Sequence, residues 1–190
     1  MKTFRNTLLM TLTILVFGLR AFETFASAGQ IVGNGGDVLE CVDPKTGQVR
    51  VELLDLFEAR ARGIHLDLGS AETPTEHKIA QMLERLRPRT PLRTDSYSAQ
   101  VASFWSESMK VRGVSLPDVP DSKHLMLPSG CFVKQVVIQQ TPDFSNPSRY
   151  TIDMDIYDRL DSDSQAALIL HEVIYREAIS VGHLDSIAVR

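Results

Sequence analysis

The 190-residue sequence has no excess of positive charge and only a short apolar run near its start. Its 20 Lys and Arg against 24 Asp and Glu give a formal net charge of −4, which argues against a dedicated nucleic-acid-binding protein, because such proteins usually carry a basic face. The apolar run at residues 7–19 is about 13 residues long, whereas a membrane-spanning helix needs about 20. With 43% hydrophobic and 23% charged residues, the composition is typical of a globular protein, and the length predicts one domain.

Familiar catalytic and phosphate-binding motifs are also missing. The Gly-rich stretch at residues 29–37 contains neither a GxGxxG pattern nor a P-loop, and the chain lacks the GxSxG element of serine hydrolases. No internal repeat or interdomain linker divides the sequence. No motif therefore specifies a reaction.

The first 28 residues have the pattern of a secretory signal peptide. Lys2 and Arg5 precede the apolar run, and Ala26-Ser27-Ala28 matches the small-x-small pattern of a cleavage site. We therefore expect residues 1–28 to be removed on export to the periplasm or the extracellular space. Residues 29–37 would then form a flexible Gly-rich N-terminus. An N-terminal membrane anchor is the alternative interpretation.

The sequence holds two cysteines, Cys41 and Cys131. Neither is near the cleavage position, which argues against a lipoprotein. Export would take both residues to an oxidising compartment, where disulfides persist. We predict a disulfide bond between them; a free nucleophilic thiol and two buried reduced residues are the alternatives.

The periodicity of apolar residues predicts a single α+β domain at residues 38–190, in which a small antiparallel or mixed sheet packs against three or four helices. Strands are expected at residues 38–42, 49–51, 131–140 and 150–152, with a turn at 43–47. Helices are expected at residues 53–62, 74–87, 95–112 and 161–178.

One cluster in the last of these helices suggests chemistry. His171 and Glu172 follow an apolar run and are similar to the start of the zinc-peptidase motif HExxH, although Tyr175 stands where the second His would be. A catalytic zinc site is possible with His171, His183 and Asp185 as ligands and Glu172 as the base that activates water. The spacing of His183 departs from the extended form of the motif.

The structural interpretation of the same cluster is a buried polar network of His171, Glu172, Tyr175, Arg176 and Arg190. His171 and Tyr175 are four residues apart and share one face of the helix, and Glu172 and Arg176 have the spacing of a helical ion pair. Glu172 could instead anchor the C-terminal segment by pairing with Arg190.

These two interpretations lead to two functions. The main prediction is a non-catalytic exported module that binds an envelope or extracellular partner, without a cofactor, without nucleic acid and without a membrane span once the signal is removed. The alternative is a divergent zinc-dependent hydrolase acting on envelope peptide or glycan.

Several short segments occur in a characteristic order along the chain. They are GNGGD at residues 33–37, ELLDLFEAR at 52–60, GC at 130–131, LILHEVIYREA at 168–178 and GH at 182–183. In these segments the sequence resembles a family of uncharacterised exported proteins from predatory and related Gram-negative bacteria. The resemblance implies export and places residues 171–190 in the shared pattern, and it implies no activity.

Overall fold

The computed structural model describes residues 31–34, 36–117 and 126–182, with the backbone alone for residues 31–34. The strands are β1 (Ile31–Asn34), β2 (Asp37–Val42), β3 (Val49–Leu53), β4 (Ser108–Val111), β5 (Cys131–Gln135), β6 (Val137–Gln140) and β7 (Tyr150–Asp153). The helices are α2 (Leu54–Ala61), α3 (Thr75–Leu86), α4 (Pro91–Ser103), α5 (Met154–Tyr157) and α6 (Ser162–Ser180). The prediction of an α+β fold is confirmed.

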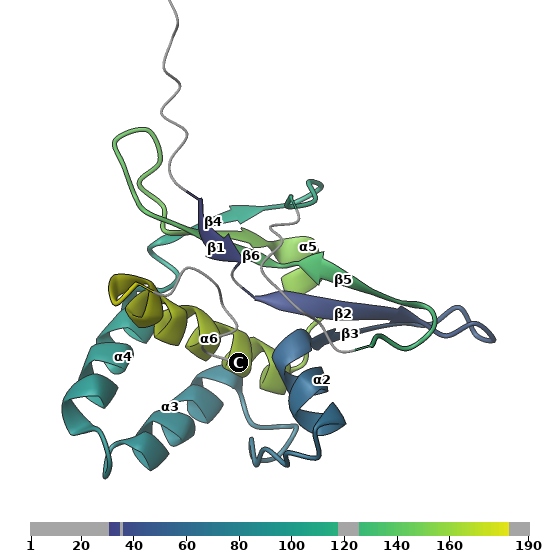
Figure 1. Cartoon of the computed structure of the whole chain (residues 1–190), viewed down its shortest axis with the longest axis horizontal. Helices are drawn as coiled ribbons and strands as arrows, with labels where there is room; N and C mark the ends of the chain where they lie inside the picture. The colour runs from purple at the N-terminus through teal and green to yellow at the C-terminus, as the bar shows by residue number, and fades with distance from the viewer. Residues whose placement is uncertain (1–30, 35, 118–125, 183–190) are drawn as a thin grey trace, which may run out of the picture.

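The strands form two small sheets (Figure 1). One sheet has four strands in the order β1-β6-β7-β4, and the other has three in the order β3-β2-β5. The β4–β7 pair is parallel, and the remaining pairs are antiparallel. The four-stranded sheet is therefore mixed, whereas the three-stranded sheet is a hairpin extended by β5.

Helices α3, α4 and α6 pack against one another below the strands in the view of Figure 1. A partly buried ion pair joins α3 to the first turn of α6, because the fully buried Lys78 ammonium contacts the more exposed Asp163 carboxylate. Thr75 and Gln165 add a hydrogen bond of 2.9 Å between the same helices. The core lies between these helices and the sheets and includes Val38, Leu53, Phe104, Val137, Ile152, Leu168 and Val173.

The predicted disulfide between Cys41 and Cys131 is confirmed, and the two cysteines are 90 positions apart in the sequence. The two residues are directly opposite each other on β2 and β5, so the bond ties the central strand of the three-stranded sheet to an edge strand. In Figure 1 the strand ends that this bond joins, the end of β2 and the start of β5, extend beyond the helices. The crosslink thus reinforces the region of the sheet that has the least helix packed on it.

The turn between β2 and β3 forms as its sequence predicts. The carboxylate of Asp43 accepts hydrogen bonds from the backbone N–H groups of Lys45 (2.8 Å) and Thr46 (2.9 Å). Gly47 follows with φ of +69°, a conformation that glycine adopts without the steric cost of a Cβ atom.

The N-terminal segment differs from its prediction. Residues 29–37 were expected to be flexible, but residues 31–34 form β1, which pairs with β6, and Asp37 begins β2. Gly36 lies between these strands, and its carbonyl accepts hydrogen bonds from Val136 (3.1 Å) and Val137 (3.3 Å). Gly36 thus serves a close approach between the backbone and its neighbours. The predicted signal peptide, residues 1–28, lies outside the described residues.

The single strand predicted at residues 131–140 is wrong, because the chain changes sheets at the buried Val136. β5 belongs to the three-stranded sheet, and β6 belongs to the four-stranded sheet. The adjacent apolar residues Val136 and Val137 interrupt the alternation of one strand, since each is buried in the region where the two sheets meet.

The third predicted helix is also displaced. α4 begins at Pro91, in the first helical turn, where proline loses no hydrogen bond. It ends at Ser103, and the unpredicted strand β4 precedes Gly113. The unpredicted helix α5 begins where the side chain of Asp153 accepts hydrogen bonds from Asp155 N (2.9 Å) and Ile156 N (3.2 Å).

Within the described parts of the chain, no helix has the length and apolar character needed to cross a membrane.

Candidate functional site

α6 carries the His171–Glu172 cluster through the centre of the protein. The Asp161 carboxylate caps the helix by accepting a hydrogen bond from Ser164 N (2.8 Å). Residues 168–173 are all buried. Because successive residues of a helix point in different directions, this segment is enclosed on every side, and both polar side chains of the cluster must be accommodated inside the fold.

His171 is held by a carboxylate from α2. Its Nδ1 is 2.6 Å from Oδ2 of Asp55, and the residue is 4% exposed. Asp55 lies in the first turn of α2, directly after β3, so the strand and the helix together aim the carboxylate at α6. The ring of Tyr175 lies 6.1 Å from that of His171, centroid to centroid, as their shared helix face predicts.

Glu172 is fully buried and contacts the backbone of the N-terminal segment. Its Oε1 accepts a hydrogen bond of 2.5 Å from the N–H of Gly36. Burial raises the pKa of this carboxyl to about 7; the nearby His171 and the Gly36 N–H act in the opposite direction, and Asp55 raises the value further. Glu172 therefore changes charge near neutral pH inside the core.

We expect this titration to make the stability of the protein fall as pH rises. The usual pKa of a Glu carboxyl is 4.5, so between that value and about 7 the unfolded chain loses the proton while the folded chain keeps it. The difference between about pH 5 and pH 7.5 amounts to about 2 kcal/mol, and above pH 7.5 the contribution levels off. Urea unfolding at both pH values measures it.

Glu172→Gln is the matched variant for this prediction, since the amide has the same shape and does not ionise. Its free energy of unfolding should change less between the two pH values than that of the natural chain, by about the same 2 kcal/mol. Parallel pH profiles of the two proteins would contradict the prediction. Other titrating groups cancel in the comparison.

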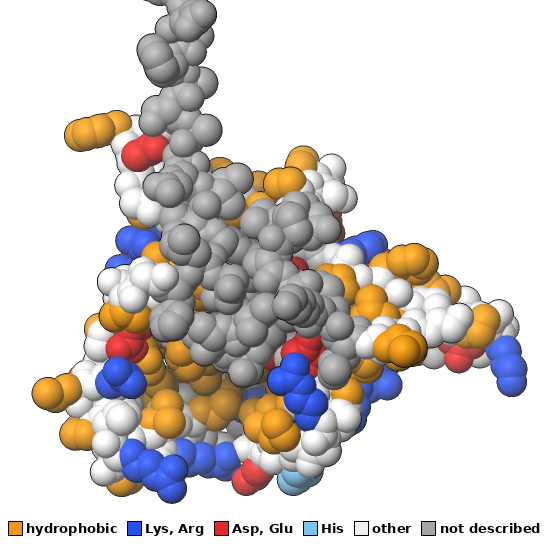
Figure 2. All heavy atoms as spheres, in the orientation of Figure 1, with side chains coloured by type: hydrophobic (Ala, Val, Ile, Leu, Met, Phe, Trp, Pro, Cys, Tyr) orange, Lys and Arg blue, Asp and Glu red, His pale blue; other side chains and the backbone are white. Residues whose placement is uncertain are grey.

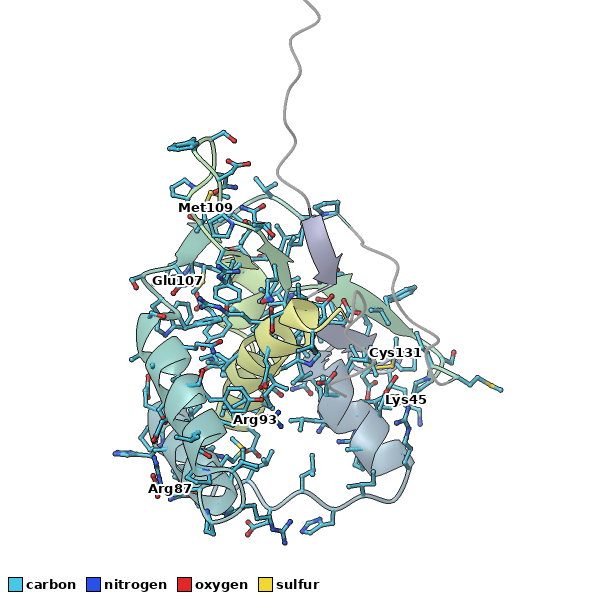
Figure 3. All side chains as sticks on the ribbon, turned by 60° about the vertical axis from the view of Figure 1, so that its left-hand side comes forward. Lys45, Arg87, Arg93, Glu107, Met109 and Cys131 are labelled. Carbon is cyan, nitrogen blue, oxygen red and sulfur yellow. A yellow bond between two sulfur atoms is a disulfide. The ribbon has the colours of Figure 1, made fainter. Side chains whose placement is uncertain are left out.

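Arg176 pairs with a different acid from the one predicted. Its Nη1 is 3.0 Å from Oε2 of Glu107, which also contacts Arg149 at 3.2 Å. Glu107 follows α4 at the upper left of Figure 3. Burial raises the pKa of Glu107, but the Ser103 hydroxyl and the two arginines outweigh it, so the pKa lies below its usual value. Glu172 and Arg176 share the spacing of a helical pair, but each bonds across the fold instead.

Glu177 also forms an ion pair and a hydrogen bond, both with residues of α4. Its carboxylate pairs with Arg93 of α4 at 3.0 Å and accepts a hydrogen bond from the hydroxyl of Tyr97. Burial and this carboxylate raise the pKa of Tyr97 to about 12. The last two turns of α6 are thus fastened to α4.

The predicted metal ligands are only partly placed. His183, Asp185 and Arg190 lie outside the described residues. Among residues 36–117 and 126–182, no group of three or more His, Cys, Asp or Glu side chains is arranged to hold a metal ion. Of the proposed ligands, the structure thus places His171 alone, next to Asp55.

Three partners of the cluster were not identified from the sequence: Gly36, Asp55 and Glu107. Gly36 and Asp55 belong to two of the short segments noted above, GNGGD and ELLDLFEAR. Their positions in the chain do not indicate that they contact α6. Glu107 follows a helix in a segment without any motif. A pairing over such separations needs the tertiary fold.

One open hollow of the surface lies away from His171 and Glu172. It has a volume of about 290 Å³ and lies between β3, α2 and the segment that follows α2, and Arg50, Arg60 and His65 are among its lining residues. Neither His171 nor Glu172 is part of that lining. The cluster is therefore an internal feature in the described structure, whereas the hollow is open to solvent.

No family model, curated protein or solved structure matches the chain, so its function is inferred from the geometry of its own residues.

Proposed function

We propose that the protein is an exported, non-catalytic module that binds a partner in the cell envelope or outside the cell. The observation that carries this proposal is the enclosure of both central side chains of α6. His171 is 4% exposed and paired with Asp55, and Glu172 is 0% exposed and bonded to Gly36. A base that activates water for hydrolysis must reach a substrate, whereas these two groups connect α6 to α2 and to the N-terminal segment.

An apolar surface away from this cluster supports the proposal. Val42, Val49 and Phe132 are 38%, 46% and 61% exposed. Val42 and Val49 are directly opposite each other, and Phe132 is two positions along on the neighbouring strand, so the three share one face of the three-stranded sheet. Figure 2 shows hydrophobic side chains gathered on this projecting part of the molecule. Contiguous exposed apolar groups commonly mark interaction surfaces.

The disulfide supports the exported location, since cysteines of cytosolic proteins are normally kept reduced. The N-terminal sequence pattern points the same way.

Zinc analysis of the purified chain separates this proposal from the hydrolase alternative. The protein is produced in zinc-supplemented medium as the natural chain, as His171→Asn, and as His77→Asn, a control in which an exposed histidine of α3 is changed. We expect no stoichiometric zinc in any of them and a lower melting temperature for His171→Asn alone, because the Asp55 contact is weakened. About one zinc per chain, lost in His171→Asn and kept in His77→Asn, would overturn the proposal.

A further inference from the structure

The outer edge of β3 carries backbone groups that face away from the sheet. Among the described strands, β3 pairs with β2 alone, and α2 lies beside it (Figure 1). The turn between β2 and β3 sets the hydrogen-bond pattern, because Asp43 N–H donates to the carbonyl of Gln48 at 2.9 Å. In an antiparallel pair, bonded and non-bonded positions alternate, so the next pair, Val42 and Val49, is a non-bonded one.

The other end of β3 follows the same alternation. The N–H of Leu53 points away from β2 and donates to the hydroxyl of Ser164 on α6 at 3.3 Å. The pairing of β3 with β2 is continuous, so the N–H and C=O groups of Val49 and Val51 face the same outer side as those of Leu53. Among the residues that the structure describes, none bonds to these outward groups of Val49 and Val51. An edge of this kind is a template for a further strand.

The hollow of about 290 Å³ lies against this edge. Val51 of β3 is part of its lining, and so is Ser164, which closes the edge at the α6 end. Ile64 and Leu66, from the segment that follows α2, also line the hollow and are 53% and 45% exposed. The open backbone groups therefore border a recess with exposed apolar side chains.

The two faces of β3 differ in chemistry. Val49 and Val51 are on the face that carries the exposed apolar side chains described above, and Val49 is one of those side chains. Arg50 is on the opposite face, together with Glu52, which pairs with Arg60 of α2. A strand added at this edge would therefore meet valines on one face and a cation on the face toward α2.

The charges that line the hollow favour an acidic side chain beside Arg50. Arg50 is exposed and forms no ion pair with any residue in the described part of the chain. The acids of the lining already have partners: Glu52 pairs with Arg60, Asp163 pairs with Lys78, and Asp161 caps α6. Arg50 is thus a positive charge available to a binding partner.

We propose that the outer edge of β3 binds an extended segment of a partner protein, which joins the three-stranded sheet as a fourth strand. The backbone of this segment bonds the outward groups of Val49 and Val51, its apolar side chains lie next to these valines, and an acidic side chain lies opposite Arg50. This inference rests on the proposed function, since it names the kind of partner and the place where it binds.

Peptide binding to the purified, oxidised protein tests the charge preference. The probe is the fluorescently labelled peptide VEVEVEV, and VKVKVKV is its matched control. We expect the acidic peptide to bind more tightly. Arg50→Glu should weaken the acidic peptide by about fivefold and strengthen the lysine peptide, because the cross-strand charge pair is reversed. No binding of VEVEVEV, or equal binding of both peptides, would overturn the proposal.

Methylation of the peptide backbone tests whether the strand edge is used, and it needs no protein variant. Alternate N–H groups of an extended peptide point to opposite sides, so only one alternate set can face β3. N-methyl groups on that set should abolish binding, whereas N-methyl groups on the other set should leave it unchanged. Similar affinities of the two methylated peptides would overturn the proposal.

Two protein variants separate the edge from the apolar face. Val49→Pro removes an outward N–H that takes no part in the pairing with β2, so it should abolish peptide binding and keep the fold. Phe132→Thr changes the exposed face on β5, the opposite edge strand, and should bind the peptide as the natural chain does. The reverse result would assign binding to the apolar face, which overturns the edge proposal and keeps the proposed function.

Sedimentation of the natural chain and of Val49→Pro identifies the occupant. We expect both to be monomers in the absence of peptide. A dimer of the natural chain that Val49→Pro abolishes would show that a second copy occupies the edge, and would overturn the proposal. The zinc analysis above tests the proposed function separately, so a zinc-free protein that fails to bind the peptide would contradict the edge proposal alone.

Discussion

Replacing Cys41 and Cys131 with alanine is expected to lower the free energy of unfolding by about 4–5 kcal/mol. The bond closes a loop with a sequence separation of 90 residues, so its removal gives the unfolded chain many more conformations. It also frees the edge strand β5 from the central strand β2 at the projecting end of the sheet. Denaturant unfolding of the two proteins at one pH measures the loss.

Reduction of the natural chain is the control for this experiment. With a strong reductant, the natural protein should unfold at nearly the same denaturant concentration as the double alanine variant, since both then lack the crosslink. A variant as stable as the oxidised natural protein would contradict the prediction, because the disulfide would then contribute nothing to the free energy of unfolding. A large difference between the reduced protein and the variant would point to an effect of the alanines themselves.

Gly36→Ala is expected to lower the free energy of unfolding by about 3 kcal/mol, at the upper end of the cost of overpacking a core. A Cβ atom at this position would lie 1.8 Å from Cδ1 of Leu168 and 3.6 Å from Oε1 of Glu172. Either the buried Leu168 side chain would have to leave its place in the core, or the backbone would have to move away from α6. A backbone shift would lengthen the buried hydrogen bond to Glu172 and disturb the contacts of Gly36 with β6. Thermal and denaturant unfolding measure the effect.

The clash itself can be tested by removing its other partner. Leu168→Ala alone creates a cavity in the core and should cost about 2–5 kcal/mol. In the double variant the new methyl group occupies part of the space of the missing Leu side chain, so the total loss should be clearly smaller than the sum of the two. Full additivity would show that Gly36 is needed for another reason than this close approach.

Local chemistry explains which elements were predictable. The turn at Asp43–Gly47 depends on an acid and a glycine a few residues apart, and the start of α6 on a capping Asp161. The disulfide needed no geometry, because the chain has two cysteines and an export pattern. In each case the deciding residues are neighbours in sequence or are singled out by their chemistry.

The partners of His171 and Glu172 on α6 could not be predicted from neighbouring residues in the sequence. Glu172 bonds to a residue 136 positions away, and His171 pairs with one 116 positions away. Both were foreseen as part of a polar network, but the network was expected along the helix and toward the C-terminal segment. Helical spacing predicts that Glu172 and Arg176 can meet, and cannot show that each has a better partner across the fold.

The arrangement of β1 and β2 has a consequence for the order of folding. β1 pairs with the distant β6, and β2 pairs with the distant β5 besides its neighbour β3. The backbone N–H of Gly36, between β1 and β2, bonds to Glu172 of α6. β2 can therefore form its hairpin with β3 early, whereas the contacts of β1 with β6 and of Gly36 with Glu172 can form only after these later elements have been made. Such non-local contacts slow folding, because the entropy of closing a long loop is lost before the contacts form.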